Sequence, residues 1–280
     1  PENNQIRVPA QMDPADPGSY RARKRSILCA GLMMSAPGIP MLFQGQEFLT
    51  PIHFYDTNSL NWTLTNTYAG VLRFYEDMVR LRKNDLGISG GLTGAYVQAS
   101  MQPLVFTNTS LLTLHRRNGG GVGDDVFVVA NLSDVPVDGD WLDWPATGQW
   151  YTVLNTDDPR YGSDFGGAGY GDSFVFGDLR GPIAIAPWSM MVFSRVPPPP
   201  TYTGMALAGT YNGWNPVANM RKVNQHEWVR DLELAPTNGF AFKFTADGVW
   251  TNINWGTGTV ASTTWPVTGT ANAWGGDFSI

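Results

Sequence analysis

The sequence predicts a mixed fold, in which a short helix–strand–helix segment precedes two all-β domains. Three observations predict it. Helix-like periodicity lies before residue 85, short strand-like runs between turns continue to residue 196, and four prolines at 197–200 separate a second group of such runs. We therefore expect three parts: residues 1–85, residues 86–196, and residues 197–280, which begin with the proline spacer.

Residues 19–36 are expected to form the first helix. Ser19 follows Pro17-Gly18 and can cap the helix, apolar residues recur along one side, and Pro37 ends it. Its first turns carry cations at the end where the helix dipole disfavours them, so we expect acidic groups nearby. These cations are Arg21, Arg23, Lys24 and Arg25.

A short apolar run, Ile39–Phe43, follows this helix and ends in the polar sequence Gln44-Gly45-Gln46-Glu47. Such a run suits a strand buried on both faces, as in a parallel sheet covered by helices. The next helix is expected over 68–83, with Thr65 or Thr67 as its cap and basic residues near its end. Helix, buried strand and helix in this order are typical of a βα-repeat.

Strand-like runs dominate the remainder of the chain. Residues 111–117 and 125–132 flank a Gly-rich turn and predict a hairpin, and the region to residue 196 predicts a sandwich. The other expected strands are 149–154, 173–176, 182–186 and 189–195 before the prolines, and 205–208, 228–234 and 240–244 after them.

The composition narrows the class of ligand. The net charge is −6, which argues against nucleic acid or an anionic membrane as the main partner. Aromatic residues make up 12% and charged residues only 15%, a balance that suits a neutral, polyhydroxylated ligand. No apolar run reaches the length of a membrane span. The single cysteine, Cys29, excludes an internal disulfide.

The first part of the chain resembles a known family. NNQIRVPAQMDPADPGSYRARKRSILCAGLMMSAPGIPMLFQGQEF is similar to the last part of the catalytic barrel of the α-amylase superfamily, most closely that of glucan-branching enzymes. PGIPMLFQGQEF matches the final barrel strand, and NTYAGVLRFYEDMVRLRKN matches the helix after it. VLNTDDPRYGSDFGGAGYGD and GPIAIAPWSMMVF resemble the C-terminal β-domain of that group. The resemblance covers residues 1–195 and implies that residues 1–85 end a (β/α)8 barrel.

The resemblance also implies that the catalytic groups lie upstream of this chain. Family members cleave an α-glucosidic bond with retention, which needs two carboxyl groups about 5–5.5 Å apart. A further aspartate belongs to a His-Asp pair just before the position of Asn3-Asn4. The three histidines here, His53, His115 and His226, are not followed by aspartate. We therefore expect no catalytic residue, no cofactor and no turnover on amylose from this chain.

Four polar residues are expected at the rim of the substrate cleft. The carboxyl ends of parallel barrel strands carry the functional groups, and the tail of the apolar run lies at such an end. By resemblance the rim residues are Arg7, Gln44, Gln46 and Glu47. The alternative is that they only satisfy backbone groups there.

The part after the prolines predicts a carbohydrate site. Asn212-Gly213 and Asp247-Gly248 are turn sequences that place Trp214 and Trp250 on loop tips. An indole face can stack on a sugar ring whose hydroxyl groups need polar partners, and the candidates for these are Lys243, Asn252 and Asn254. The alternative is that both tryptophans belong to the core.

This stretch is similar to starch- and glycogen-binding β-sandwich modules, which contact α-glucan at the positions of Trp214, Lys243 and Trp250. Such modules continue for a strand or two beyond Gly275-Gly276-Asp277-Phe278, so we expect the sequence to be cut at both ends. We expect no metal: a calcium site formed by Asp157, Asp158 and Asp164 fits no ligand pattern, and a solvated loop is the alternative.

Together these observations predict the C-terminal portion of an α-glucan-active enzyme, of the branching type, that acts on starch or glycogen. Its expected partners are α-glucan and the missing N-terminal part of its own barrel. The alternatives are a non-catalytic glucan-binding protein and an α-amylase or trehalose-releasing hydrolase. The location follows from that choice, cytoplasmic for a branching enzyme and extracellular for an amylase.

Overall fold

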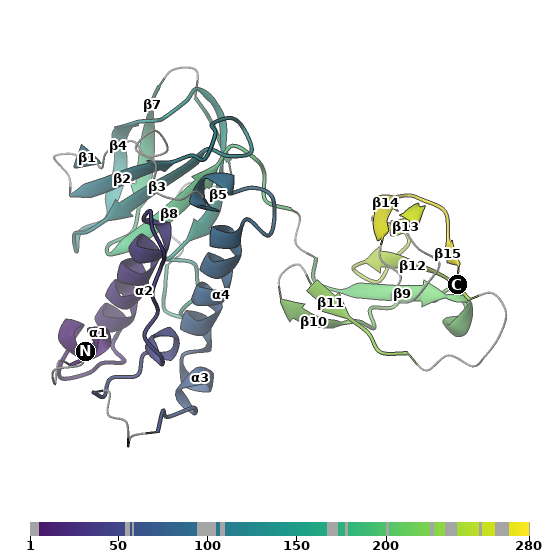
Figure 1. Cartoon of the computed structure of the whole chain (residues 1–280), viewed down its shortest axis with the longest axis horizontal. Helices are drawn as coiled ribbons and strands as arrows, with labels where there is room; N and C mark the ends of the chain where they lie inside the picture. The colour runs from purple at the N-terminus through teal and green to yellow at the C-terminus, as the bar shows by residue number, and fades with distance from the viewer. Residues whose placement is uncertain are drawn as a thin grey trace. The chain divides into compact units, whose positions relative to one another are not determined.

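The chain forms two compact units, residues 1–198 and 199–280, in a computed structural model (Figure 1). The boundary falls within the expected proline spacer, while the finer division at residue 85 remains a prediction. The residues that the structure describes are 6–53, 57, 59–93, 105–106, 110–166, 173–176, 179–199, 202–224, 227–232, 240–251, 254–260 and 269–279.

The first unit is built on a six-stranded antiparallel sheet of order β1-β2-β3-β8-β5-β6. A second, two-stranded sheet pairs β4 with β7. The expected hairpin is present as β2 and β3. The strands are β1 (Val105–Phe106), β2 (Leu111–Arg116), β3 (Val126–Asn131), β4 (Val137–Asp143), β5 (Gly148–Asn155), β6 (Ser173–Phe176), β7 (Arg180–Ile185) and β8 (Ser189–Ser194).

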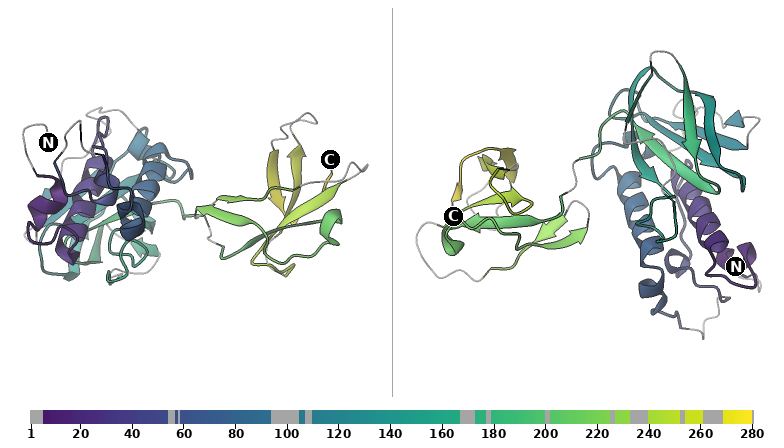
Figure 2. Two further views of the ribbon diagram at one scale, coloured as in Figure 1. Left: turned by 90° about the horizontal axis from the view of Figure 1, so that it is seen from below. Right: turned by 180° about the vertical axis from the view of Figure 1, so that it is seen from behind.

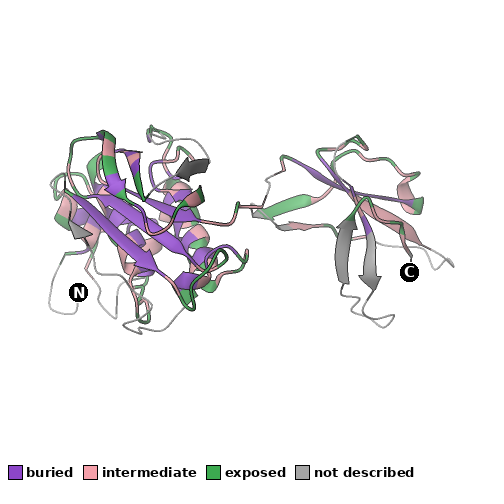
Figure 3. Cartoon of the chain, turned by 90° about the horizontal axis from the view of Figure 1, so that it is seen from above, coloured by how far each residue is buried: buried purple, intermediate pink, exposed green. Residues whose placement is uncertain are grey.

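Every residue of the central strands β2, β3 and β8 is buried (Figure 3). The reason is that both faces of the sheet are covered, and alternate residues of a strand point to opposite faces. On β3, Val126 and Val128 pack against the helices, whereas Phe127 and Val129 pack against the β4–β7 side with Trp144. Two hydrophobic cores therefore share one sheet.

Two long helices run side by side on one face of this sheet (Figures 1 and 2). Both were predicted from their periodicity, and the Ser19 cap is confirmed, since Ser19 Oγ accepts from the Ala22 N–H at 3.1 Å. The predicted threonine cap of the second helix is wrong. A short helix precedes it, and Tyr68 is the N-cap without a side-chain bond. The helices are α1 (Val8–Met12), α2 (Tyr20–Ser35), η1 (Gln46–Phe48), α3 (Leu64–Thr67), α4 (Ala69–Lys83) and α5 (Gly90–Thr93).

Charges from other elements stabilise both ends of α2. Near its N-terminus Arg23 forms two hydrogen bonds with Asp164, at 2.8 and 2.6 Å, so the expected acidic group is present. At its C-terminus Arg82 donates to the carbonyl oxygens of Met34 and Ala36, at 3.0 and 2.7 Å. Cations at this end satisfy free carbonyl groups and oppose the negative pole of the helix dipole.

The acidic loop after β5 packs onto the helices, which corrects the interpretation of a solvated loop. Asp157 is 2% exposed and pairs with the equally buried Lys24 of α2. Tyr161 donates to Asp77 of α4 at 2.7 Å, and a side chain at Gly70 would overlap the Tyr161 backbone. Among the described residues, no group of three His, Cys, Asp or Glu side chains is arranged to hold a metal ion.

The prediction of a buried strand at Ile39–Phe43 is wrong for this structure. The segment has no regular secondary structure, and Ile39 and Met41 are 98% and 81% exposed. A strand needs neighbours that satisfy its backbone N–H and C=O groups, and no described strand pairs with this one. The side chains of Ile39, Met41 and Leu42 therefore face solvent.

The second unit contains a five-stranded sheet. Its order is β14-β13-β12-β15, with β9 on the other edge of β12. A separate pair joins β10 and β11. The strands are β9 (Met205–Gly209), β10 (Arg221–Asn224), β11 (Glu227–Val229), β12 (Ala241–Ala246), β13 (Asn254–Val260), β14 (Gly269–Ala273) and β15 (Phe278–Ser279), with η3 at Thr210–Asn212. In neither unit do the described residues include a helix long and apolar enough to cross a membrane.

His115 gives the first unit a predictable pH dependence. The side chain is 8% exposed on β2, and its Nε2 lies 3.1 Å from Oδ1 of Asp125, which also pairs with Arg195. Burial lowers the pKa of His115 below its usual 6.5, and Asp125 opposes this shift. The unfolded chain therefore takes up the proton at a higher pH than the folded chain.

We expect the contribution of His115 to the free energy of unfolding to be fully present above about pH 6.5. It should be lost as the pH falls from there toward the pKa of His115 in the folded chain. Urea unfolding between pH 7.5 and 5.5 measures this fall. A His115→Gln variant should show a shallower dependence over that range. Equal slopes in the two proteins would contradict the assignment to His115.

Candidate functional site

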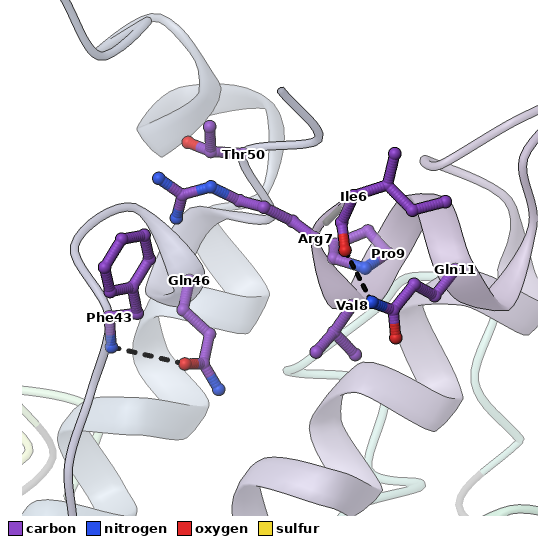
Figure 4. A pocket seen from close by; sticks show the side chains of 8 residues that line it. All are labelled: Ile6, Arg7, Val8, Pro9, Gln11, Phe43, Gln46 and Thr50. Carbon is purple, nitrogen blue, oxygen red and sulfur yellow. Dashed lines mark hydrogen bonds between the residues drawn. The ribbon is translucent and has the colours of Figure 1, made fainter. Parts of the chain in front are cut away.

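A pocket of about 180 Å³ opens in the first unit between the start of α1 and the segment that precedes η1 (Figure 4). Two of the predicted rim residues, Arg7 and Gln46, line it, together with apolar groups. The carbonyl oxygen of Gln44 accepts a hydrogen bond from Arg7, and Glu47 follows Gln46 within η1. The complete lining is Ile6, Arg7, Val8, Pro9, Gln11, Phe43, Gln46 and Thr50.

Arg7 connects the start of α1 to the segments on either side of η1. Its Nε donates to the carbonyl oxygen of Ile52 at 2.8 Å, and one terminal nitrogen donates to that of Gln44 at 2.6 Å. The guanidinium carbon lies 4.5 Å from the centre of the Phe43 ring, within the range of a cation–π contact. Burial lowers the pKa of Arg7, and the charge of Glu47 opposes that shift.

The turn at Gly45 makes this arrangement possible. Gly45 has a φ of 84°, and a side chain there would press on Thr50 and Leu60. After this turn Gln46 accepts from the Phe43 N–H at 3.4 Å, so the polar tail folds back on the apolar run (Figure 4). Phe43 and Thr50 were not predicted as site residues, because an aromatic side chain and a lone threonine carry no signal for a pocket in the sequence.

The second unit brings Trp214 and Trp250, which were expected on two separate loop tips, next to each other. Their ring centres are 6.3 Å apart with planes tilted by 45°, and Trp250 Nε1 donates to the Trp214 carbonyl oxygen at 3.2 Å. Both side chains are half-buried. At each turn the glycine, Gly213 or Gly248, has a positive φ. The pair forms an apolar surface that is fixed before any ligand binds.

Strand register assigns two of the predicted polar residues to one face of the sheet. Lys243 and Thr245 are two residues apart on β12, and Asn254 on β13 is directly opposite Thr245. These three side chains therefore share a face, since directly paired residues do. Thr245 Oγ1 donates to the Pro216 carbonyl oxygen at 3.5 Å, so the segment that carries Trp214 crosses this same face.

The polar candidates differ in how accessible they are. Asn254 is 7% exposed, whereas Lys243 retains partial exposure and pairs with Asp277 at 3.4 Å. Asn252 lies outside the described residues. Asp277 was not predicted, since only the fold brings it next to Lys243.

Sequence comparison finds relatives that match more than half of the chain. The 1,4-alpha-glucan branching enzyme GlgB of Rubrobacter xylanophilus is 32% identical over 181 residues, which are 62% of this chain and 23% of that enzyme. The GlgB of Mesorhizobium japonicum is 30% identical over 150 residues, 51% of this chain and 19% of the relative. No protein-family model matches. The chain spans about a fifth of the length of these relatives.

Solved structures overlap the chain at low scores. The pullulanase of Anoxybacillus sp., crystallised with maltotetraose, is 19% identical at a TM-score of 0.47. The match covers 64% of this chain and 24% of the pullulanase chain. A debranching enzyme from Nostoc punctiforme is 12% identical at a TM-score of 0.46. The match covers 69% of this chain and 34% of the debranching enzyme.

The sequence relatives confirm the predicted resemblance to enzymes of the α-amylase superfamily. The relatives found are 1,4-alpha-glucan branching enzymes GlgB, and the chain is homologous to them over 51–62% of its length. The β-rich content of the structure agrees with the predicted class of fold.

Proposed function

We propose that this chain is the C-terminal portion of a glucan-branching enzyme, in which it completes the catalytic barrel and carries a glucan-binding module. The observation that carries the proposal is its similarity to GlgB enzymes of two bacteria. In this proposal residues 1–85 are the last segment of a (β/α)8 barrel, residues 86–196 a sandwich domain, and residues 197–280 the module. The substrate is an α-glucan such as starch or glycogen.

The exposed apolar segment supports the role in the barrel. Ile39 and Met41 lie two residues apart, so in a strand they would point to the same face. Bare apolar side chains next to a helix pair are unfavourable unless another surface covers them. Neighbouring barrel strands would supply both that cover and the missing backbone partners.

The pocket beside the segment supports a role at the substrate cleft. Arg7, Gln44, Gln46 and Glu47 gather at the polar end of the apolar run, which is the end where barrel enzymes carry their functional groups. These residues form a rim. Retaining hydrolysis or transfer requires two carboxyl groups in close proximity, and in the proposal these groups come from earlier barrel strands.

A chimaera tests the proposal. The barrel of the Rubrobacter xylanophilus enzyme, with its own matching C-terminal part replaced by this chain, should branch amylose and lower its iodine colour. The same chimaera with Ile39→Asp and Met41→Asp should be inactive, since two carboxylates cannot be buried unpaired between strands. Val122→Asp, at an exposed valine elsewhere in the unit, is the matched control and should remain active.

Two results would refute the role in the barrel. One is a chimaera that melts cooperatively and has no activity. The other is a double aspartate variant as active as the Val122→Asp control. Turnover of amylose by this chain without any added barrel would instead show that its catalytic groups are its own.

A further inference from the structure

Trp274 is an unusual residue in the second unit. It follows β14, is 62% exposed, and has a φ of 61°. A bulky residue in the left-handed region is uncommon and strained, and such strain gathers at functional sites. Trp214 has nearly the same conformation, with a φ of 60°.

The loop that begins with Trp274 crosses the face that carries Lys243. The Trp274 N–H donates to the Asn254 carbonyl oxygen at 2.8 Å, next to the register pair Trp255 and Ala273. Gly256 lies two residues beyond Asn254, so a side chain there would point to the same face as Asn254. That side chain would overlap the carbonyl oxygens of Gly275 and Gly276. The loop therefore lies directly over this face.

The far end of the loop returns to the candidate site. Asp277 pairs with Lys243 at 3.4 Å, and the next residue, Phe278, stacks on Phe242 with ring centres 5.1 Å apart. These contacts fix the loop at both ends, at Asn254 and at Lys243. The backbone position of Trp274 is therefore set before any ligand binds, which lowers the entropy cost of binding.

We propose that Trp274 is a third sugar-stacking residue, which extends the surface of Trp214 and Trp250 into one track for an α-glucan chain. The strand order places β9 and β14 three strand spacings apart, about 14 Å in total. A chain of several glucose units is long enough to span this width, with the Lys243–Asp277 pair beneath it. The inference rests on the proposed glucan binding of this unit and adds a subsite to it.

Calorimetric titration of the full chain tests the subsite, with maltoheptaose as the long probe and maltose as the short one. Trp274→Ala should bind maltoheptaose about tenfold more weakly and maltose within about twofold of the parent, because one indole face is lost from the long track only. Trp274→Phe should recover most of the difference. Trp141→Ala, which removes a tryptophan of similar exposure from β4 of the first unit, is the matched control and should bind both sugars normally.

The outcomes separate this inference from the function on which it rests. If the parent binds and Trp274→Ala binds maltoheptaose equally well, the third subsite is refuted while the module stands. If Trp274→Ala weakens both sugars equally and also lowers the melting temperature, Trp274 has a structural role and the inference again fails. If the parent binds neither sugar, the inference and the proposed module are both wrong.

Discussion

Replacing Trp214 and Trp250 together by alanine is expected to weaken binding of maltoheptaose by about a hundredfold. The two ring centres are 6.3 Å apart, so a single sugar chain bound at the proposed site would contact both rings. Each indole face buried against a sugar contributes on the order of 1.4 kcal/mol, and the two together give the hundredfold change. Calorimetric titration of the full chain measures this difference.

The double replacement is the right test because the pair is coupled. Trp250 Nε1 donates to the Trp214 carbonyl oxygen, so Trp250→Ala also removes a bond that positions the Trp214 turn. Trp228→Ala, at another half-buried tryptophan of the same unit, controls for a general loss of packing and should keep its affinity. A folded double variant that binds like the parent would show that the site lies elsewhere.

The sequence allowed the prediction of those elements whose pattern is local. The helices α2 and α4 repeat apolar residues at three- and four-residue steps, and the hairpin of β2 and β3 flanks a glycine-rich turn. The Trp214 and Trp250 turns carry their own signals, Asn-Gly and Asp-Gly. In each case a few neighbouring residues determine the conformation.

Other elements depend on distant partners and could not be read locally. β4 has the sequence VDGDWLD, whose polar residues and glycine do not predict a strand. It forms a strand because it pairs with β7. The opposite error occurs at Ile39–Phe43, which has the composition of a buried strand and no strand beside it. Composition predicts what a segment can form, while its neighbours decide whether it does.

The residues predicted for the rim illustrate the same limit at the candidate site. Arg7 would be an ordinary surface arginine by its sequence alone, and the resemblance to barrel enzymes was the reason to select it. The structure explains why the Arg7 side chain is held in place, because Ile52, Gln44 and Phe43 surround its guanidinium. The contacts join residues 37 and 45 positions apart, and no sequence pattern encodes such a pairing.

Breaking the buried ion pair between α2 and the loop after β5 should be the most damaging change in the first unit. Lys24 and Asp157 have side chains 1% and 2% exposed, and Lys24 also donates to Ser189 at 2.6 Å. Asp157→Leu leaves a buried ammonium group without its carboxylate. We expect a loss of about 3–5 kcal/mol in the free energy of unfolding at pH 7, measured by urea denaturation.

A neighbouring pair on the same helix and loop provides the matched control. Arg23 and Asp164 are bonded as closely, but the Asp164 side chain is 47% exposed, so Asp164→Leu should cost only about 0–1 kcal/mol. The double variant Lys24→Met with Asp157→Leu should recover most of the stability, because it leaves no buried charge.

The pH provides a second, independent readout of the same pair. Burial already lowers the pKa of Lys24, and without Asp157 to oppose it the shift should grow. The folded Asp157→Leu variant would then bind fewer protons than the unfolded chain, so its stability should rise between pH 7 and 9 more than that of the parent. Equal losses for Asp157→Leu and Asp164→Leu, with no difference in pH dependence, would mean that burial does not govern the strength of these two ion pairs.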